Sequence, residues 1–362
     1  MIMNKEKNDS KTNNEDVIWF DPLETNAIRV RGFAWFDNDR RYRRLPASSD
    51  SLVARVSPNV ARLSGDAAGG QIHFRTDSDT VEIAAELAAP SLMSHMTIAS
   101  QGGFDCYVGS DFSDLKFYAT TTFPVDAKSY RYRFFAGVPG DKLVVLNFPL
   151  YNRVESVRVG VKPGAALRDP GDFPQPGRIV VYGTSITQGA CASRPGLCYT
   201  NILSRRLGIE FINLGFSGSA FGEPEIAELV SEVSGARMFV LDYEANAGTN
   251  GRLYRTLEDF IKIIRGRYPN APIVVVSRIK YLFDELNPGT LGKMRRELRE
   301  FQKNVVSALR EKGDDAVYFV DGSGFFPDDY HEFTVDSVHP NDIGFYRIAE
   351  GLEKEIRKIL KI

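Results

Sequence analysis

The sequence predicts an α/β protein in which an N-terminal all-β sandwich domain, jelly-roll-like, precedes an α/β/α domain with a five-stranded parallel sheet. Three observations predict this fold. Short runs in which apolar and charged residues alternate fill the first half of the chain, and a segment rich in proline and glycine follows. Apolar strands then alternate with amphipathic helices. The 362 residues suffice for two domains, each with a sizeable core.

The region 17–167 has the period of β-strands. Apolar and charged side chains alternate in runs such as 130–134 and 154–159, as in strands with one buried face and one wet face. Other runs of this kind lie at 72–76, 81–83 and 115–118. No amphipathic stretch here is long enough to predict a helix, so we expect a β-sandwich or jelly roll.

Residues 168–177 include three prolines and two glycines, a composition that disfavours both helix and sheet. We therefore place a linker there, between a β domain at 17–167 and an α/β domain at 178–362. The polar segment 1–16 is expected to be a disordered tail.

Beyond the linker, compact apolar strands alternate with helical patterns. The strands are expected at 179–182, 210–214, 238–241, 273–276 and 317–320. Apolar side chains recur at helical spacing within 226–233, 253–264, 294–309 and 348–359. Five strands that are each followed by a helix predict a parallel sheet covered by helices on both faces.

Composition excludes several classes of function. The 45 basic and 47 acidic side chains leave a formal charge of −2, and no basic block appears, which argues against binding to nucleic acid or to a membrane surface. The longest apolar runs are far shorter than the roughly 18 residues of a membrane span. We expect a soluble protein.

The three cysteines are too few for a disulfide framework, and no Cys/His cluster predicts a metal site. Cys191 and Cys198 could pair across one loop, but sparse usage favours free thiols. The first 16 residues contain no apolar signal-peptide core, so we expect a cytoplasmic protein, or a secreted or periplasmic one if a leader has been removed.

Ligands of parallel α/β sheets bind at the carboxyl ends of the strands, so the loops that follow the strands are the place to look for chemistry. The first strand ends in Gly183-Thr-Ser-Ile-Thr-Gln-Gly189, which places Ser185 near the start of a helix. The segment is neither a GxSxG elbow nor a phosphate loop. Ser185 is a candidate nucleophile, and the alternative is that Thr184 and Ser185 only cap the helix.

A serine nucleophile needs a base, and the base needs an acceptor that fixes its tautomer. His339 in Asp336-Ser-Val-His-Pro340 follows the fifth strand, and three residues on a turn allow the Asp336 carboxylate to reach its ring. The remaining histidines lack such a neighbour or lie within a predicted strand: His73, His95 and His331. We therefore predict a Ser185, His339 and Asp336 triad.

Acyl transfer also requires donors for the oxyanion of the tetrahedral intermediate. The second strand leaves through Asn213-Leu-Gly-Phe-Ser-Gly-Ser219, and the third leads to Asn246. We predict an oxyanion hole formed by the backbone N–H groups of Ser185 and Gly218 and by the Asn246 amide. A flexible turn at Gly218 and a turn-favouring asparagine are the alternatives.

The motifs around these residues resemble those of a known superfamily. Residues 176–362 resemble the SGNH (GDSL-like) hydrolase superfamily, whose four blocks are matched by Ser185, Gly218, Asn246 and His339 with Asp336. The run 187–196 is similar to a bacterial branch of GDSL-like lipase/acylhydrolases, and Gly103-Phe-Asp-Cys-Tyr107 is similar to the Gly-x-Asp-Leu-Tyr signature of the β domain found in that branch. The resemblance implies a flavodoxin-like catalytic domain.

The sequence departs from the superfamily pattern at three positions. Thr184 stands where Gly-Asp-Ser would have the aspartate, Ala247 replaces the aspartate that usually follows the asparagine, and Cys106 replaces the signature leucine. The first two changes remove carboxylates beside the site and keep the proposed donors. The change at Cys106 has no catalytic implication.

The resemblance implies a serine esterase that needs no metal or organic cofactor and acts on small acyl esters, with acetyl esters of carbohydrates as the first choice. The alternatives are a lysophospholipase or thioesterase, and an inactive carbohydrate-binding protein. The expected partner is a small-molecule or oligosaccharide ester. Several further residues could line the pocket or bind sugar, although structural roles are favoured for all of them: Arg194, Tyr243, Glu244, Tyr281, Trp19 and Trp35.

Overall fold

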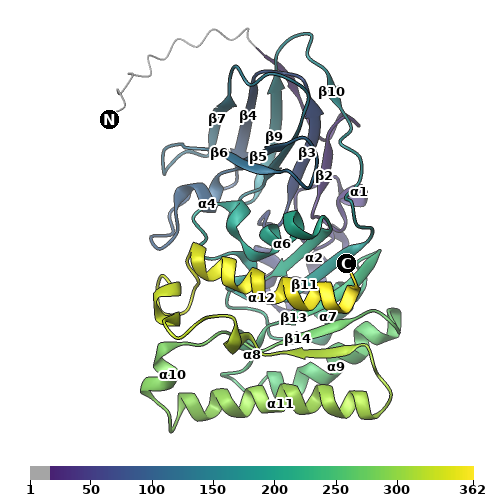
Figure 1. Ribbon diagram of the computed structural model, residues 1–362, viewed down its shortest axis with the longest axis vertical. Helices are drawn as coiled ribbons and strands as arrows, with labels where there is room; N and C mark the ends of the chain where they lie inside the picture. Colours follow the sequence, from purple (N-terminus) through teal and green to yellow (C-terminus); the bar gives the residue numbers. More distant parts are fainter. Residues whose placement is uncertain (1–16) are drawn as a thin grey trace.

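The computed structural model describes residues 17–362, and the tail expected at 1–16 lies outside them. Two antiparallel sheets form one end of the molecule, and a parallel sheet with helices on both faces forms the other (Figure 1). Both the predicted β-sandwich and the predicted five-stranded parallel sheet are confirmed.

The β-sandwich has a four-stranded sheet in the order β1-β9-β4-β7 and a second sheet in the order β10-β3-β8-β5-β6, with β2 also paired to β3. Inward side chains of β3, β4, β8 and β9 fill the core between the sheets. The strands are β1 Ile18–Phe20, β2 Arg29–Arg31, β3 Gln71–Thr76, β4 Val81–Leu87, β5 Asp105–Gly109, β6 Lys116–Thr120, β7 Ser129–Phe135, β8 Lys142–Asn147, β9 Val154–Val161 and β10 Leu167–Arg168.

The region 17–167 also contains helices that the sequence pattern did not reveal. Four short helices interrupt it, namely α1 Phe36–Asp39, α2 Asp50–Val56, α3 Pro58–Leu63 and α4 Ile98–Gly102, with a 3-10 turn η1 at Ala47–Ser49. Pro58 divides α2 from α3, so neither helix is long enough to give a clear helical period. Val53, Val60 and Leu63 are instead buried in the core of the following α/β part.

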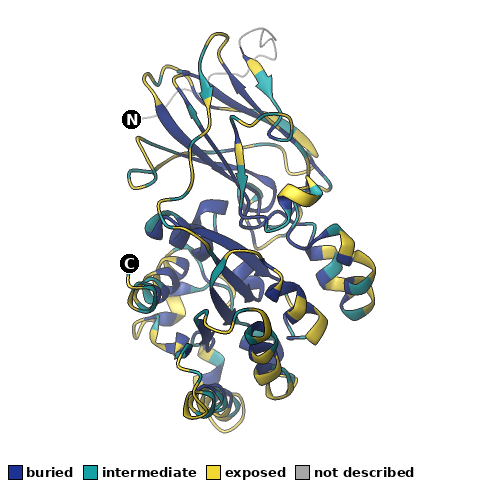
Figure 2. Cartoon of the chain, turned by 90° about the vertical axis from the view of Figure 1, so that its right-hand side faces the viewer, coloured by how far each residue is buried: buried dark blue, intermediate teal, exposed yellow. Residues whose placement is uncertain are grey.

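The parallel sheet has the order β12-β11-β13-β14-β15, which is the 2-1-3-4-5 order of flavodoxin-like folds. Its strands are β11 Arg178–Gly183, β12 Glu210–Gly215, β13 Ala236–Asp242, β14 Ile273–Val276 and β15 Val317–Val320. Strands β11 to β14 are buried through their centres, as expected of strands covered on both faces (Figure 2). In the edge strand β15 the ends, Val317 and Val320, are buried, and the two central residues are half-buried.

One face of the parallel sheet packs against α7 Pro224–Ser231, α9 Leu253–Arg267 and α11 Leu291–Glu311. The other face packs against α6 Tyr199–Leu207 and α12 Asp342–Leu360. Short elements at the strand ends complete the fold: α5 Ser185–Gln188, η2 Pro195–Leu197, α8 Glu244–Ala247, α10 Leu282–Leu286, η3 Gly322–Gly324 and η4 Tyr330–Phe333.

The segment 168–177 runs along the second sheet of the sandwich. Arg168 still pairs with β3, and Asp169 and Asp172 form ion pairs with Arg29 and Arg31 of β2. We propose that the domain boundary lies within this segment, because antiparallel pairing ends at Arg168 and parallel pairing begins at residue 178.

Candidate active site

Strand β11 delivers a serine to the carboxyl edge of the parallel sheet. Gly183 ends the strand, and a Cβ there would lie 2.0 Å from Thr187 Oγ1, so close packing of α5 on the strand requires glycine. Thr184 then caps α5, because its hydroxyl accepts a hydrogen bond from the Ile186 N–H. Ser185 begins the helix and is 8% exposed.

Three side chains from two loops form one continuous hydrogen-bonded chain. Ser185 Oγ lies 2.8 Å from His339 Nε2, and His339 Nδ1 lies 2.7 Å from Asp336 Oδ2. A carboxylate only accepts, so Nδ1 carries the ring proton and Nε2 is left to accept from the serine hydroxyl. The arrangement therefore holds a hydroxyl against a base that a carboxylate orients.

A tight loop before α12 fixes this pair. Ser337 adopts a left-handed conformation with φ of 70°, and the Val335 N–H donates to the His339 carbonyl across the turn. Asp336 Oδ1 accepts from the backbone N–H groups of Val338 at 3.1 Å and His339 at 2.7 Å. Partial burial opposes ionisation of Asp336, but these bonds and the His339 ring outweigh it and hold its pKa below the usual range.

The loop after β12 turns toward the same edge. Gly218 has φ of +65°, in the left-handed region that favours glycine. Apart from its two chain neighbours, no residue in the described range 17–362 has a heavy atom within 4 Å of the position its Cβ would occupy. Neighbouring bonds hold the turn, since the Ser219 N–H donates to the Phe216 carbonyl and the Ser217 N–H donates to Gln188 Oε1.

Asn246 in α8 is oriented by the same loop. Its Oδ1 accepts from the Ala220 N–H at 3.2 Å. Because that N–H can only donate, the amide oxygen faces Ala220 and Nδ2 faces the other way. Within residues 17–362 we find no hydrogen-bond acceptor for Nδ2, so this donor remains for a ligand.

Comparison with known proteins decides the family. The sequence profile of the GDSL-like lipase/acylhydrolase family matches residues 177–357, and that of the N-terminal domain of SGNH-hydrolase-type esterases, GxDLY, matches residues 17–167. The chain belongs to the GDSL-like lipase/acylhydrolase family. It is an esterase or acylhydrolase, and the resemblance described from its motifs is confirmed.

Solved structures agree with this assignment. A GDSL-like lipase from Bacteroides ovatus ATCC 8483 is 30% identical, with a TM-score of 0.85 over 96% of this chain and 99% of the other. The salicylyl-acyltransferase SsfX3 from a tetracycline biosynthetic pathway is 24% identical, with a TM-score of 0.77 over 95% and 97% of the two chains. A family two carbohydrate esterase from Cellvibrio japonicus is 12% identical, with a TM-score of 0.62 over 95% and 98%.

The two less similar structures show a shared fold only. A search of curated proteins found no significant match. Within residues 17–362, no helix has both the length and the apolar character needed to cross a bilayer.

The β-sandwich contributes a wall of the GDSL-type site. The His95 ring lies 6.1 Å from the His339 ring, and the Cys191 thiol donates to the His95 carbonyl at 3.5 Å. Met96 packs with Cys191 near the serine, and the Tyr151 hydroxyl donates to the Ser185 carbonyl at 3.4 Å. Local sequence gave no signal for His95, because its place beside His339 depends on how the two parts of the chain dock.

The structure also brings together a potential metal-ligating group that spacing did not indicate. One ligand atom each from Cys191, Asp336 and His339 lie within 4.8 Å of one another. Ligand atoms around tetrahedral zinc are closer, at about 3.6 Å for metal–ligand bonds of about 2.2 Å. Burial, with Asp336 nearby, raises the pKa of Cys191 to about 12. The thiol is therefore a neutral neighbour of the Asp336–His339 pair.

The strand ends hold a further carboxylate that the sequence analysis did not single out. Asp242 is the last residue of β13, and its Oδ2 accepts from Tyr199 at 3.0 Å and from Thr187 at 3.2 Å. Burial raises the pKa of Asp242 to about 7. Because Thr187 belongs to α5, Asp242 helps to position the helix that carries Ser185.

The residues suggested as possible pocket lining make contacts within the fold. Arg194 donates to Asp105 Oδ2 at 2.7 Å and to the Tyr107 hydroxyl at 2.6 Å, so the signature 103–107 ties the sandwich to the α/β part. Tyr243 is buried and bonds Thr256.

Glu244 is buried too, and it forms ion pairs with Arg278 and Arg295 and accepts from Gln302 at 2.7 Å. Tyr281 is buried in the core beneath α12.

The three cysteines are free and buried. The two tryptophans are half-buried. The guanidinium groups of Arg131 and Arg158 stack over Trp19, and Trp35 packs against the core of the α/β part. These contacts give both tryptophans packing roles.

Proposed function

We propose that the protein is a serine esterase that hydrolyses small acyl esters, with acetyl esters of carbohydrates as its preferred substrates. The observation that carries this proposal is the hydrogen-bonded chain from Ser185 through His339 to Asp336. A nucleophile, a base and an orienting carboxylate in this order are the parts that ester hydrolysis by serine requires.

In the proposed reaction, Ser185 is the nucleophile, His339 transfers the proton and Asp336 stabilises the charged ring. His339 Nε2 takes the proton as Ser185 Oγ attacks the ester carbonyl, and Asp336 stabilises the imidazolium that forms. His339 then gives this proton to the departing alcohol. Water attacks the acyl-serine with His339 as base again, which releases the carboxylic acid and restores the hydroxyl.

The tetrahedral intermediates carry a negative oxygen that needs donors in place before the reaction. The backbone N–H groups of Ser185 and Gly218 and the Nδ2 of Asn246 would supply them. Two features support this assignment: Asn246 Nδ2 faces away from Ala220, and the left-handed Gly218 exposes its backbone at the same sheet edge.

The crowding around the serine supports a short acyl group. Met96, Ala190 and Cys191 are buried in one cluster, against which Met93 and Tyr151 pack. Tyr151 also donates to the Ser185 carbonyl, which holds its ring beside the backbone of that residue. The carbohydrate part of the proposal is supported by fold, since carbohydrate esterases of family two share this architecture.

Hydrolysis of p-nitrophenyl acetate, butyrate and octanoate tests the proposal. We expect turnover to fall with acyl length and to be lost in Ser185→Ala, whereas Ser51→Ala, an exposed serine on α2, keeps wild-type rates. Equal turnover by Ser185→Ala would overturn the serine mechanism and favour a binding protein. Faster turnover of octanoate than of acetate would favour a lysophospholipase or thioesterase.

Acetate release from acetylated mono- and oligosaccharides then tests the alcohol part. We expect Ser185-dependent release from the sugars at a higher kcat/KM than from p-nitrophenyl acetate. If the sugar esters are not hydrolysed while p-nitrophenyl acetate is, the esterase stands and the carbohydrate assignment fails.

A further inference from the structure

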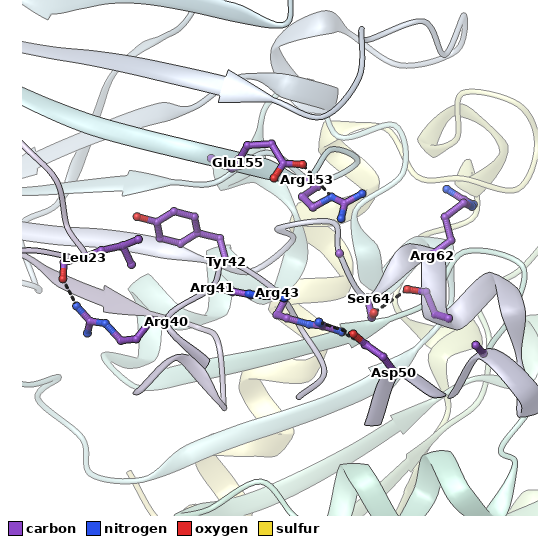
Figure 3. Close-up of a pocket in the computed structure, with 14 residues that line it drawn as sticks. Leu23, Arg40, Arg41, Tyr42, Arg43, Asp50, Arg62, Ser64, Arg153 and Glu155 are labelled. Carbon is purple, nitrogen blue, oxygen red and sulfur yellow. Dashed lines mark hydrogen bonds and ion pairs between the residues drawn. The ribbon is translucent and has the colours of Figure 1, made fainter. Parts of the chain in front are cut away.

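Arginines gather around a cavity that contains none of the catalytic residues. The cavity has a volume of about 650 Å³ and lies between the loop after α1, the helices α2 and α3, and the start of β9 (Figure 3). Its volume is within the range of small-ligand sites, about 300–1,000 Å³. Five guanidinium groups line it: Arg40, Arg41, Arg43, Arg62 and Arg153.

Among the described residues, two carboxylates belong to the lining, and the buried Asp66 lies close enough behind it to interact with Arg62 and Arg153. Arg43 donates to both oxygens of Asp50, and Arg153 Nε lies 3.3 Å from Glu155 Oε1. The lining therefore carries three positive charges in excess, although the whole chain has a formal charge of −2. An excess of one sign within a cavity attracts ligands of the opposite sign.

Two of the arginines have free donors. Within residues 17–362, the side chains of Arg41 and Arg62 make no hydrogen bond or ion pair, and both are exposed to the cavity and solvent. Two deeper polar groups in the lining, Arg43 Nε and the Tyr42 hydroxyl, are buried without a hydrogen-bond partner in the described part of the chain. Unpaired buried polar atoms are uncommon and call for an explanation.

The guanidinium fork matches the spacing of carboxylate and phosphate oxygens and donates two hydrogen bonds to either group. Several such forks around one cavity suit a ligand with more than one oxyanion. We propose that this cavity is a second binding site of the protein, for a small organic anion with two or more carboxylate or phosphate groups. Its occupation does not require the serine esterase chemistry.

The cavity is separate from the catalytic site, but the same short segment of chain contributes a residue to each. Tyr151, which contacts Ser185, and Arg153, which lines the cavity, are two residues apart. Two residues of extended chain span about 7 Å. Anion binding and ester hydrolysis are thus expected at neighbouring but separate positions.

Calorimetric titration at low ionic strength tests the proposal with pyrophosphate, citrate, trigalacturonate and, as a neutral control, maltotriose. We expect saturable binding of at least one anion and none of maltotriose. Because a charge-assisted bond to arginine is strong, the double variant Arg41→Ala/Arg62→Ala should bind at least ten-fold more weakly. Arg55→Ala, an exposed arginine on α2 outside the lining, should bind as the wild type does.

Two further measurements separate this site from the esterase. Ser185→Ala should bind the anion like the wild type, and the double arginine variant should hydrolyse p-nitrophenyl acetate like the wild type. If the double variant unfolds, the milder Arg62→Gln takes its place, with at least a few-fold weaker binding expected. Failure of ester hydrolysis alone leaves this proposal standing.

The proposal is overturned if no anion gives saturable heat at roughly 10 mM. It is equally overturned if the arginine variants bind as tightly as the wild type. Tighter binding of pyrophosphate than of the carboxylates would identify a phosphate-bearing ligand, and the reverse order would identify a polycarboxylate such as an acidic oligosaccharide.

Discussion

The replacement Asp336→Asn tests the catalytic relay with little disturbance of the loop. Asp336 Oδ1 accepts two backbone hydrogen bonds, and Oδ2 accepts one from the His339 ring. An asparagine keeps the first two through its own oxygen. Its NH₂ group then faces His339 Nδ1, which must become an acceptor, so the ring proton moves to Nε2 and the ring cannot take the Ser185 proton.

The size of the effect follows from this tautomer change. The same replacement in a serine protease triad lowers kcat about 10⁴-fold, or roughly 5.4 kcal/mol of barrier. The Asp336 side chain here is 38% exposed, so solvent screens its interaction with His339 more than in a buried triad. We therefore expect a loss of about 10³- to 10⁴-fold in kcat with a small change in KM.

Stopped assays with p-nitrophenyl acetate measure this loss, and Glu332→Gln is the matched control, because it removes the same charge from an exposed side chain on the same loop. Thermal unfolding should show that Asp336→Asn remains folded. A folded Asp336→Asn enzyme with kcat within ten-fold of the wild type would refute the role assigned to Asp336.

Three further outcomes are expected. Asn246→Asp keeps the acceptor for the Ala220 N–H but loses the Nδ2 donor. We therefore expect kcat to fall about 10²- to 10³-fold in the same assay. An unchanged kcat would exclude Asn246 from the oxyanion hole. Because the pKa of Asp242 is raised to about 7, the contribution of Asp242 to stability should be greatest below the unfolded pKa near 4 and fall as pH rises to 7. Asp242→Asn should therefore be more stable than the wild type at pH 8, by roughly 2–4 kcal/mol in urea unfolding, with no gain at pH 4; equal stabilities at pH 8 would contradict this. Asp105→Ala leaves the partly buried Arg194 without its ion-pair partner, so the free energy of unfolding should drop by about 3–5 kcal/mol. A loss below about 1 kcal/mol would show that this ion pair contributes little to stability.

Much of the architecture could be predicted because the two halves of the chain differ in period. Alternating runs such as 154–159 became β9, and apolar runs such as 273–276 became β14. The helices α2 and α3 were missed because Pro58 leaves each of them too short for a clear period, and their burial depends on a distant partner, the α/β core.

The candidate site was partly predictable for a geometric reason. Parallel strands end at one edge, so residues that follow the first and fifth strands, 154 positions apart, were expected to meet, and Ser185 and His339 lie within hydrogen-bond distance. The sequence did not identify His95 as a residue of the site, because nothing in the local sequence of a loop histidine indicates which residues it will contact. Its place beside His339 depends on packing between the two parts.

The sequence by itself determined the order of strands and helices, the place where the fold type changes, and the strand ends at which chemistry would be found. Only the tertiary structure decided which surfaces meet: Asp105 with Arg194, His95 with His339, and five arginines around one cavity. The physical reason is the range in the sequence over which each kind of determinant acts. Periodicity and turn chemistry act over a few residues, whereas these contacts depend on side-chain packing between segments far apart in the chain.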